Sequence, residues 1–447
     1  MKLKATIRRA LPLALCLFIA PAFAEGPLNV GGPGDNPGAP FRWNPASFPL
    51  TYWTDLGNLG SRTTAQADTI AANAFKAWQD VTTASITFSR TGSLGGDVTA
   101  LNYFAVQQAI NACTNLAGDP PGGIAKPRSV IYDADGSIID LAFGAGQSDF
   151  TLGFAYPTCL TSDPLNNFYN RGLAVMSGKG NPSDTALKAV MIHEFGHMLG
   201  LDHSQVNLQC LISGCVFDND SLAGLPTMFP ILLDEAEMTT PATDDIAGLS
   251  ALYPETVNDL ANGKVPFATT TGTITGRILF SDGATQAQSF NVIARQVDNP
   301  GTLGLDESKI KAVSSVSGFL FTADNGNPIV PYPGISPSLN GSRDKTLIGY
   351  YEIPGLPPGN YTVEVEAIDG SFTAGSGVGA LGSLGIVFPM PSSVCPDGEF
   401  YDLGEANNDL CSTSTPVPVT ANPITPPVAD IILNGTPPRY DLWEDGP

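Results

Sequence analysis

The sequence predicts an α+β domain followed by an all-β domain, and three observations support this. Residues 63–80 and 183–199 show helical periodicity, with apolar side chains recurring every three or four positions. Short segments that alternate like strands lie between these two helices. After residue 271 only strand-like segments separated by Pro and Gly remain. A chain of 447 residues is long enough for two or three such domains.

Residues 1–24 have the pattern of a secretory signal peptide. Four basic residues precede an apolar run from Leu11 to Ala20, and Ala22-Phe23-Ala24 supplies a cleavage site. No later stretch is long and apolar enough to cross a bilayer. We therefore expect a protein without a membrane span that is secreted, either extracellular or periplasmic. Residues 25–40 are rich in Gly and Pro and predict a flexible arm.

The cysteines fit an exported protein. Of the seven, six lie beyond the signal peptide, and an even number in an oxidising compartment indicates disulfides. Their proximity in the sequence favours the pairs Cys113–Cys159, Cys210–Cys215 and Cys395–Cys411, although six cysteines allow fifteen pairings. The net charge of −22 argues against nucleic acid or an anionic membrane surface as a partner. We expect a monomer.

The first domain is expected to span residues 41–254. Its predicted elements are, in order, a strand formed by Phe41–Trp43 and Leu50–Trp53, a helix at 63–80, a strand at Ile86–Phe88, an insertion at 91–128 held by a disulfide, a strand at Ser129–Tyr132, a helix that begins at Ser183, and a closing helix from Asp244 to Tyr253.

One stretch carries the chemistry of this domain. His193 and His197 are four residues apart, so on a helix they project from one face and can bind one metal ion. Glu194 lies at the edge of that face, where its carboxylate can reach a metal-bound water without ligating the metal. Gly200 can take a left-handed conformation and turn the chain back, which would bring His203 to the same ion.

A zinc site is the preferred interpretation of this stretch. A single HExxH motif, two histidines four residues apart with a glutamate after the first, can arise by chance. Here the pattern is extended by a third histidine, and all three histidines of the protein lie within it. Three protein ligands with one open position are typical of a catalytic zinc, whereas a structural zinc has four.

The pattern His193-Glu194-x-x-His197-x-x-Gly200-x-x-His203 resembles the signature of metzincin zinc peptidases, in particular their matrixin branch. Leu225–Pro230 is similar to the Met-turn, in which Met228 would form an apolar floor beneath the imidazoles. Other branches carry a tyrosine where this chain has Pro230. For residues 41–254, the resemblance implies a twisted mixed sheet with an active-site helix and a Met-turn.

The resemblance also implies secondary sites. Leu152, Gly153, Phe154 and Ala155 would form an edge strand above the cleft, to which an extended polypeptide substrate could add as a further strand. An ordinary strand is the alternative. Pro230 and Ile231 would line the pocket for the residue after the scissile bond. Asp133, Asp135 and Asp140 could bind a structural Ca²⁺, although a plain acidic turn explains them equally well.

The second half of the chain is expected to be a spacer or binding module. Residues 255–270 are predicted to be a linker, and 271–436 a β-sandwich with a Gly/Ser-rich, disulfide-containing excursion at 371–415 and a tail at 437–447. Residues Tyr350–Tyr361 resemble the strand, Pro/Gly turn and strand of the carboxypeptidase-regulatory-like sandwich. This module would bind a surface or another protein.

The predicted function is that of a secreted zinc-dependent endopeptidase. One Zn²⁺ held by the three histidines would activate water, and Glu194 would act as the general base. Because no further histidine remains, we expect one zinc per chain. The alternative is a surface-associated binding protein whose β-sandwich is the functional module; the intact Glu194 argues against it. Hydrolysis of a non-peptide substrate is a third, weaker interpretation.

Overall fold

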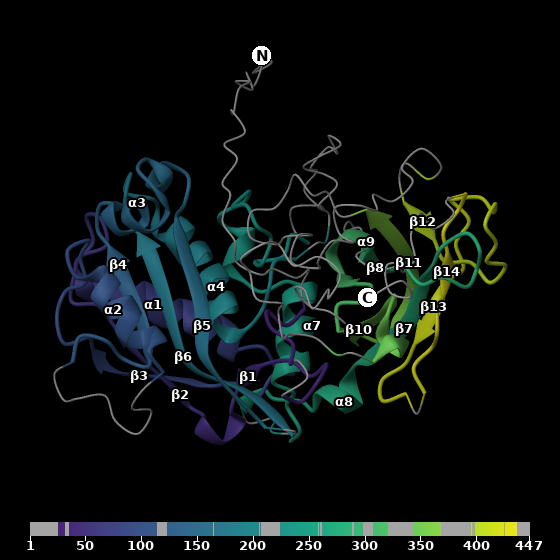
Figure 1. The fold of residues 1–447 in the computed structure, drawn as a ribbon, viewed down its shortest axis with the longest axis horizontal. Helices are drawn as coiled ribbons and strands as arrows, with labels where there is room; N and C mark the ends of the chain where they lie inside the picture. Colours follow the sequence, from purple (N-terminus) through teal and green to yellow (C-terminus); the bar gives the residue numbers. More distant parts are fainter. Residues whose placement is uncertain are drawn as a thin grey trace, which may run out of the picture.

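A computed structural model (Figure 1) describes residues 26–31, 35–113, 123–163, 165–204, 206, 224–257, 259, 262–287, 290–297, 307–320, 342, 344–367, 395, 398–423 and 425–435. The predicted signal peptide at 1–24, the Cys210–Cys215 pair and the tail at 437–447 lie outside these residues, as does most of the excursion at 371–415. The described residues form a mixed α+β part and an all-β part, with helix α7 (Thr243–Leu252) between them (Figure 1).

The N-terminal part is built on one six-stranded sheet with the order β1-β6-β4-β2-β3, in which β5 pairs with β6. The strands are β1 (Arg42–Trp43), β2 (Leu50–Thr54), β3 (Phe88–Ser93), β4 (Arg128–Asp133), β5 (Gly153–Asp163) and β6 (Asn166–Ser177). All pairs are parallel except β5 with β6, which is antiparallel. The single strand predicted at 41–53 is two strands separated by a 3₁₀ turn, η1 (Pro45–Ser47).

Helices cover both faces of this sheet. Helices α1 (Thr64–Gln79) and α4 (Asp184–Leu199) share a core with alternate strand residues such as Val130 and Tyr132. Ile131 between them faces the other side, where it packs with α2 (Tyr103–Asn111) and α3 (Ser137–Phe143). A short 3₁₀ turn, η2 (Gln147–Asp149), follows α3.

Both long helices begin at residues that the sequence favours. Thr63 and Gln66 form a capping box at the start of α1, and the hydroxyl of Ser183 accepts a hydrogen bond from the N–H of Ala186 in α4. The first disulfide, Cys113–Cys159, is confirmed and ties the end of α2 to β5. The insertion at 91–128 is therefore anchored to the edge of the sheet.

The expected flexible arm is instead packed along the domain. Residues 26–31 run beside the turn that follows α4, where the N–H of Leu28 donates to the carbonyl of Gly200. The N–H of Asp202 donates to the carbonyl of Gly26, and Val30 is fully buried. Glycine and proline content predicted flexibility, but the backbone pairing and the burial of Val30 hold this segment in place.

The C-terminal part has two sheets around one apolar core. One has the order β10-β7-β14; the other has the order β12-β11-β8-β9, with β13 on β11. The bounds are β7 (Gly272–Leu279), β8 (Phe290–Gln296), β9 (Ala312–Val316), β10 (Tyr350–Leu356), β11 (Gly359–Ala367), β12 (Glu399–Phe400), β13 (Val417–Val419) and β14 (Ile431–Ile432), with short helical turns α8 (Phe267–Thr270), α9 (Glu307–Ile310) and η6 (Lys345–Leu347). The Cys395–Cys411 disulfide is confirmed.

The segment predicted as a linker, 255–270, is attached to the first domain. The ammonium of Lys264 donates to the carbonyls of Gln79, the last residue of α1, and of Val81 and Ala84 just after it. The N–H of Val265 donates to the carbonyl of Thr82. These bonds make the segment part of the folded structure.

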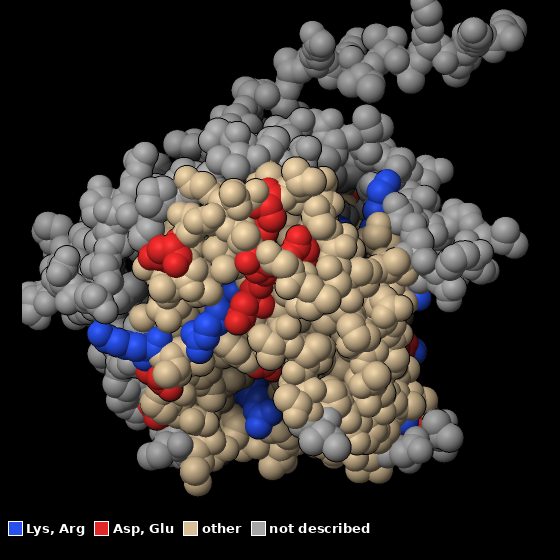
Figure 2. All heavy atoms as spheres, turned by 90° about the vertical axis from the view of Figure 1, so that its right-hand side faces the viewer, with Lys and Arg blue, Asp and Glu red and all other residues tan. Residues whose placement is uncertain are grey.

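Figure 2 shows the side of the molecule on which the all-β part lies. Its visible charged side chains are few, and acidic and basic groups lie beside each other with uncharged surface around them. The described residues visible from this side show no continuous basic patch of the kind that binds nucleic acid.

Candidate active site

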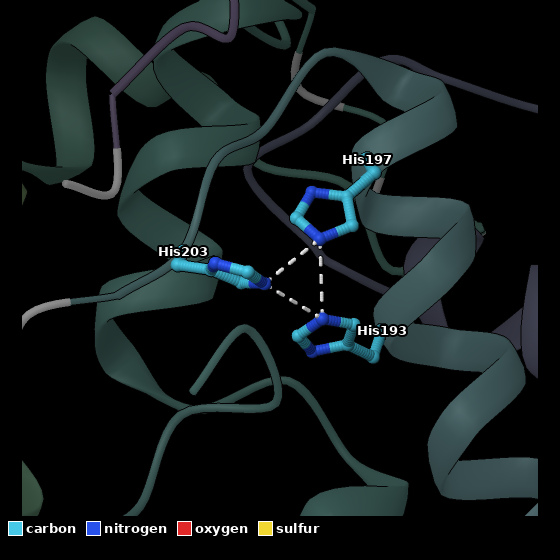
Figure 3. Close-up of side chains that lie close together, drawn as sticks. All are labelled: His193, His197 and His203. Carbon is cyan, nitrogen blue, oxygen red and sulfur yellow. Dashed lines mark hydrogen bonds between the residues drawn. The ribbon is translucent and has the colours of Figure 1, made fainter. Parts of the chain in front are cut away.

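The three histidines converge from two segments (Figure 3). His193 and His197 lie one turn apart on α4, and His203 comes from the chain after the helix. Their Nε2 atoms are 3.1 Å apart for His193–His197, 3.1 Å for His197–His203 and 3.2 Å for His193–His203. Three nitrogens at these separations can all lie about 2.1 Å from one metal ion.

The turn at Gly200 makes this convergence geometrically feasible. Gly200 has φ +95°, and a Cβ atom there would lie 2.8 Å from the ring of Tyr169. Its N–H bonds back to the carbonyl of His197, and the N–H of Leu201 to that of Gly196. This is the way in which a glycine in the left-handed conformation ends a helix. The prediction that Gly200 ends the helix and returns His203 to the metal face is thus realised in the geometry.

Two of the imidazoles have a fixed tautomer. The Nδ1 of His193 is 2.8 Å from the carbonyl of Thr227, and the Nδ1 of His197 is 2.9 Å from the carbonyl of Leu201. A carbonyl only accepts, so both Nδ1 atoms carry the proton and both Nε2 atoms present bare lone pairs. Lone pairs that face one another repel unless a cation lies between them. The donor set therefore fits a metal ion, and its outer hydrogen bonds are those typical of ligating histidines.

Electrostatics also favour neutral, metal-binding imidazoles. Burial lowers the pKa of His193 to about 4, against the opposing hydrogen bond to Thr227. Burial and the neighbouring His193 lower the pKa of His197 to about 3. Among the described residues this is also the only group of three potential ligands close enough to share an ion.

Glu194 follows the first ligand on α4. Its side chain is buried, and its Oε2 atom has no hydrogen-bond partner among the described residues. Burial alone raises the pKa of this carboxyl to about 8. A buried carboxyl with an unpartnered oxygen beside a metal site is a candidate for proton transfer rather than for packing.

Met228 lies beneath α4. A Cβ atom at Gly196, between the two helical histidines, would come within 2.2 Å of the sulfur of Met228. The backbone of this methionine is fixed, because its N–H donates to Asp245 and its carbonyl accepts from the N–H of Ser204. The methionine thus packs under the helix segment that carries the metal ligands.

Sequence reasoning missed several residues that hold this arrangement. Asp245, fully buried in α7, accepts hydrogen bonds from the N–H groups of Thr227 and Met228. The adjacent pair Asp244-Asp245 was expected only to begin a helix, and an acidic pair at a helix start gives no sign of a tertiary role. The carbonyls of Thr227 and Leu201 carry no side-chain signal at all.

Strand β5 lies at an edge of the sheet and beside α4. Gly153 lies against Glu194, since a Cβ atom there would be 2.9 Å from Glu194 Cγ. Phe154 instead faces the opposite side of the sheet, where its ring packs 4.8 Å from that of Phe143. The carbonyl of Leu152 already accepts the N–H of Ser177 on β6. The ring of Phe154 therefore does not lie on the side of the sheet that carries Glu194.

Pro230 and Ile231, predicted to line the pocket for the residue after the scissile bond, lie outside the buried core beside α4. Ile231 is 39% exposed and Pro230 is half-buried, while Phe229 and Met238 of η3 (Glu237–Thr239) are buried with Ala189 of α4. The structure brings neither Pro230 nor Ile231 into that apolar cluster.

The three aspartates proposed for calcium bind backbone N–H groups. Asp133 accepts from Gly136, Ile138 and Ile139, Asp135 accepts from Ser137, and Asp140 accepts from Ser148. They do not form a three-ligand group among the described residues. These bonds stabilise the start of α3 and the turn after it, and a calcium ion there stays a prediction.

Comparisons with known proteins place this site in a class. A family model described as matrixin matches residues 42–254, the segment that contains the sheet, α4 and all three histidines. The first half of the chain is therefore a metallopeptidase domain. More particularly, residues 42–254 belong to the matrixin family, a branch of the metzincins.

The other comparisons add little. No curated protein matches the chain. Among solved structures, a candidate carbohydrate-binding protein from Pseudomonas aeruginosa is similar over 38% of this chain and 90% of its own, at 10% identity and a TM-score of 0.11. A TM-score this low supports no statement about fold or ligand. Among the described residues, no helix has the length and apolar character needed to cross a membrane.

Proposed function

We propose that the protein is a secreted zinc-dependent endopeptidase that cleaves extended polypeptides. The observation that carries this proposal is the convergence of three histidine Nε2 atoms beside the buried carboxyl of Glu194. His193, His197 and His203 would hold one zinc ion. When bound, zinc would supply a Lewis acid that polarises the scissile carbonyl and lowers the pKa of water to about 7.

Glu194 has the role of proton carrier in this proposal. Its carboxylate accepts the proton of the attacking water and later donates it to the departing amine, so that no proton is lost. The orphaned Oε2 supports this role, because no residue of the described chain occupies that oxygen. Met228 packs beneath the site and takes no part in the chemistry.

The substrate would add to the open edge of β5. Leu152 and Ser177 form a hydrogen-bonded pair, so the alternation of an antiparallel ladder turns the N–H and C=O groups of Gly153 and Ala155 away from β6. Those groups would pair with an extended peptide. Pro230 and Ile231 would bound the pocket for the residue after the cleaved bond.

Replacement of Glu194 tests the proposal. In Glu194→Ala we expect the zinc content of the wild type and a loss of casein hydrolysis of at least about a hundredfold, the lower end of the range for general acid–base catalysis. Glu237→Ala, at an exposed glutamate of η3, is the control and should keep full activity. Full activity in Glu194→Ala would refute the role of this residue.

The second candidate function, binding by the C-terminal part alone, is not favoured. The matrixin match and the retained Glu194 both support a peptidase. Secretion is supported by the signal-peptide pattern and by two disulfides. Fusion of residues 1–24 to a reporter protein tests it, and retention of that reporter inside the cell would contradict it.

A further inference from the structure

A buried aspartate joins the metal site to the C-terminal domain. Asp244, at the start of α7, is 1% exposed. Its carboxylate accepts a hydrogen bond from the hydroxyl of Ser204, the residue directly after His203. The same carboxylate accepts from the N–H of Ser314 at 2.8 Å and from its hydroxyl at 3.1 Å. Ser314 lies on β9, so donors from both domains meet on one carboxylate.

A second contact with the C-terminal domain holds the same segment. Val206, three residues after His203, is fully buried and packs with Ile293 of β8 and Ala312 of β9. The N–H of Val206 donates to the hydroxyl of Ser204 at 3.2 Å. The chain that leaves the third histidine is therefore held by two strands of the C-terminal domain.

The rest of the domain contact is packed like a protein interior. Ala247 of α7 belongs to the apolar core of the C-terminal domain, and a Cβ atom at Gly355 of β10 would lie 2.7 Å from it. The hydroxyl of Thr243 donates to the carbonyl of Ile310 at 3.1 Å. In Figure 1, α7 lies between the two parts of the molecule. Apolar packing of this kind restricts the motion of one domain relative to the other.

The direction of the dependence follows from the burial of Asp244. A buried carboxylate is costly unless donors satisfy it, and Ser314 supplies two of the three donors described above. Without β9 the carboxylate would need water or a new partner, and Ser204 would lose its fixed acceptor. Ser204 is joined to His203 by one peptide bond, so a shift of Ser204 moves the imidazole.

We infer that the C-terminal domain is a positioning part of the metal site, with β8 and β9 holding Ser204 and Val206 and thereby His203. The inference rests on the proposed function in one respect, that zinc binds the three histidines. Asp244, Val206 and Ile293 are positioning residues, since they act on His203 through the backbone and touch no reacting atom. The spacer or binding module expected from the sequence thus has a role inside the enzyme.

Zinc affinity of full-length variants tests this inference. Asp244→Ala removes the shared acceptor, and Ile293→Ala removes the apolar contact with Val206 from the C-terminal side. Val365→Ala, in the core of the same domain on β11, is the matched control for a general loss of stability. Asp244→Asn keeps an acceptor for the N–H of Ser314 and is the conservative replacement.

The measurement is the zinc dissociation constant by competition with a chromophoric chelator, together with the visible absorption spectrum of the cobalt(II)-substituted protein. We expect zinc binding to weaken about tenfold in Asp244→Ala and severalfold in Ile293→Ala, at the low end of effects seen when ligand-supporting groups are removed. Asp244→Asn should recover most of the affinity, and the cobalt spectrum should change in the two weakened variants alone.

Two outcomes would count against different claims. Equal zinc affinity and equal cobalt spectra in Ile293→Ala, Val365→Ala and the wild type would overturn the inference, even if Asp244→Ala fails to fold. Failure of the wild type to bind zinc would instead overturn the proposed function, because His203 would then not be a zinc ligand.

Discussion

The backbone of Gly153 on the edge strand lies directly against the side chain of Glu194 on the active-site helix. A Cβ atom at position 153 would stand 2.9 Å from Glu194 Cγ and 3.2 Å from its Oε1. Both distances are shorter than ordinary van der Waals contact. The edge strand therefore determines where this carboxylate lies.

Gly153→Ala is accordingly expected to slow peptide hydrolysis. Alanine fits a strand backbone, so the fold should persist, but the added methyl group would displace the carboxylate by a fraction of an ångström. Displacements of that size cost about tenfold or more in rate. Steady-state kinetics should show the loss in kcat, with zinc content unchanged. Gly92→Ala on β3, where the nearest atom lies 4.0 Å away, is the control. Equal kcat in both variants would contradict the prediction.

Gly196 presents a conflict between helix propensity and packing. Replacement by alanine should favour a helix by about 1 kcal/mol. The added methyl group would, however, lie 2.2 Å from the sulfur of Met228, and overpacking costs about 1–3 kcal/mol. We expect the cost of overpacking to exceed the gain in helix propensity, so that Gly196→Ala lowers the urea midpoint of unfolding. In a Met228→Ala background the same replacement should be less harmful. A higher urea midpoint for the single variant Gly196→Ala would show that the gain in helix propensity exceeds the cost of overpacking against Met228.

Zinc should stabilise the folded protein with a stoichiometry of one. The bare Nε2 atoms of His193 and His197 repel one another without a cation. A ligand present at about a thousand times its dissociation constant adds about 4 kcal/mol to the free energy of unfolding. We therefore expect a chelator to lower the Tm and one equivalent of zinc to restore it. Glu194→Gln should show the same shift, whereas His203→Ala should not. Two zinc ions per chain by elemental analysis would be inconsistent with a single site.

The C-terminal domain should lose stability as the pH rises from about 4.5 to 7. Glu399 on β12 is 1% exposed, and burial raises the pKa of its carboxyl to about 7. The hydrogen bond from Asn434 opposes this shift, while Asp409 and Glu405 add to it. Because the pKa is higher in the folded state, the stabilisation is complete below the unfolded value of about 4.5 and is lost as the pH passes 7.

Glu399→Gln isolates this effect. Glutamine keeps the acceptor for the N–H of Asn434 and cannot ionise, so the variant should lose less of its free energy of unfolding between pH 5 and pH 8, by at most about 3 kcal/mol. Urea denaturation at the two pH values measures the difference. Groups that do not interact with Glu399 contribute equally to both proteins and cancel in the comparison. An equal change in the free energy of unfolding of the wild type and of Glu399→Gln between pH 5 and pH 8 would contradict the prediction.

The convergence of the three histidines was predictable because it depends on neighbouring residues in the sequence. The spacing of His193 and His197, the need for glycine at position 200, and the return of His203 all follow from the periodicity and ending of one helix. The helices at 64–79 and 184–199 were predicted for the same reason, since periodicity and caps lie within each segment. The Cys113–Cys159 pair was favoured by proximity in the sequence alone, and Cys395–Cys411 likewise.

What escaped prediction depends on contacts between distant segments. Strand β9 lies far from any motif, and its partner Asp244 belongs to a helix seventy positions earlier. Residues 26–31 pack on the turn after α4 through backbone hydrogen bonds. Such bonds do not depend on side-chain identity, so the sequence gives no sign of them. Phe154 was predicted to bind substrate because the resemblance implied an edge strand there, but alternation along β5 turns its ring to the other face of the sheet.

The ammonium of Lys264 donates hydrogen bonds to three carbonyls of the first domain. At this residue the link between the domains is therefore rigid. A nick introduced by another protease between residues 255 and 263 would leave two fragments that still migrate together under native conditions. Cleavage of this segment would not separate the two domains, because contacts outside it also join them.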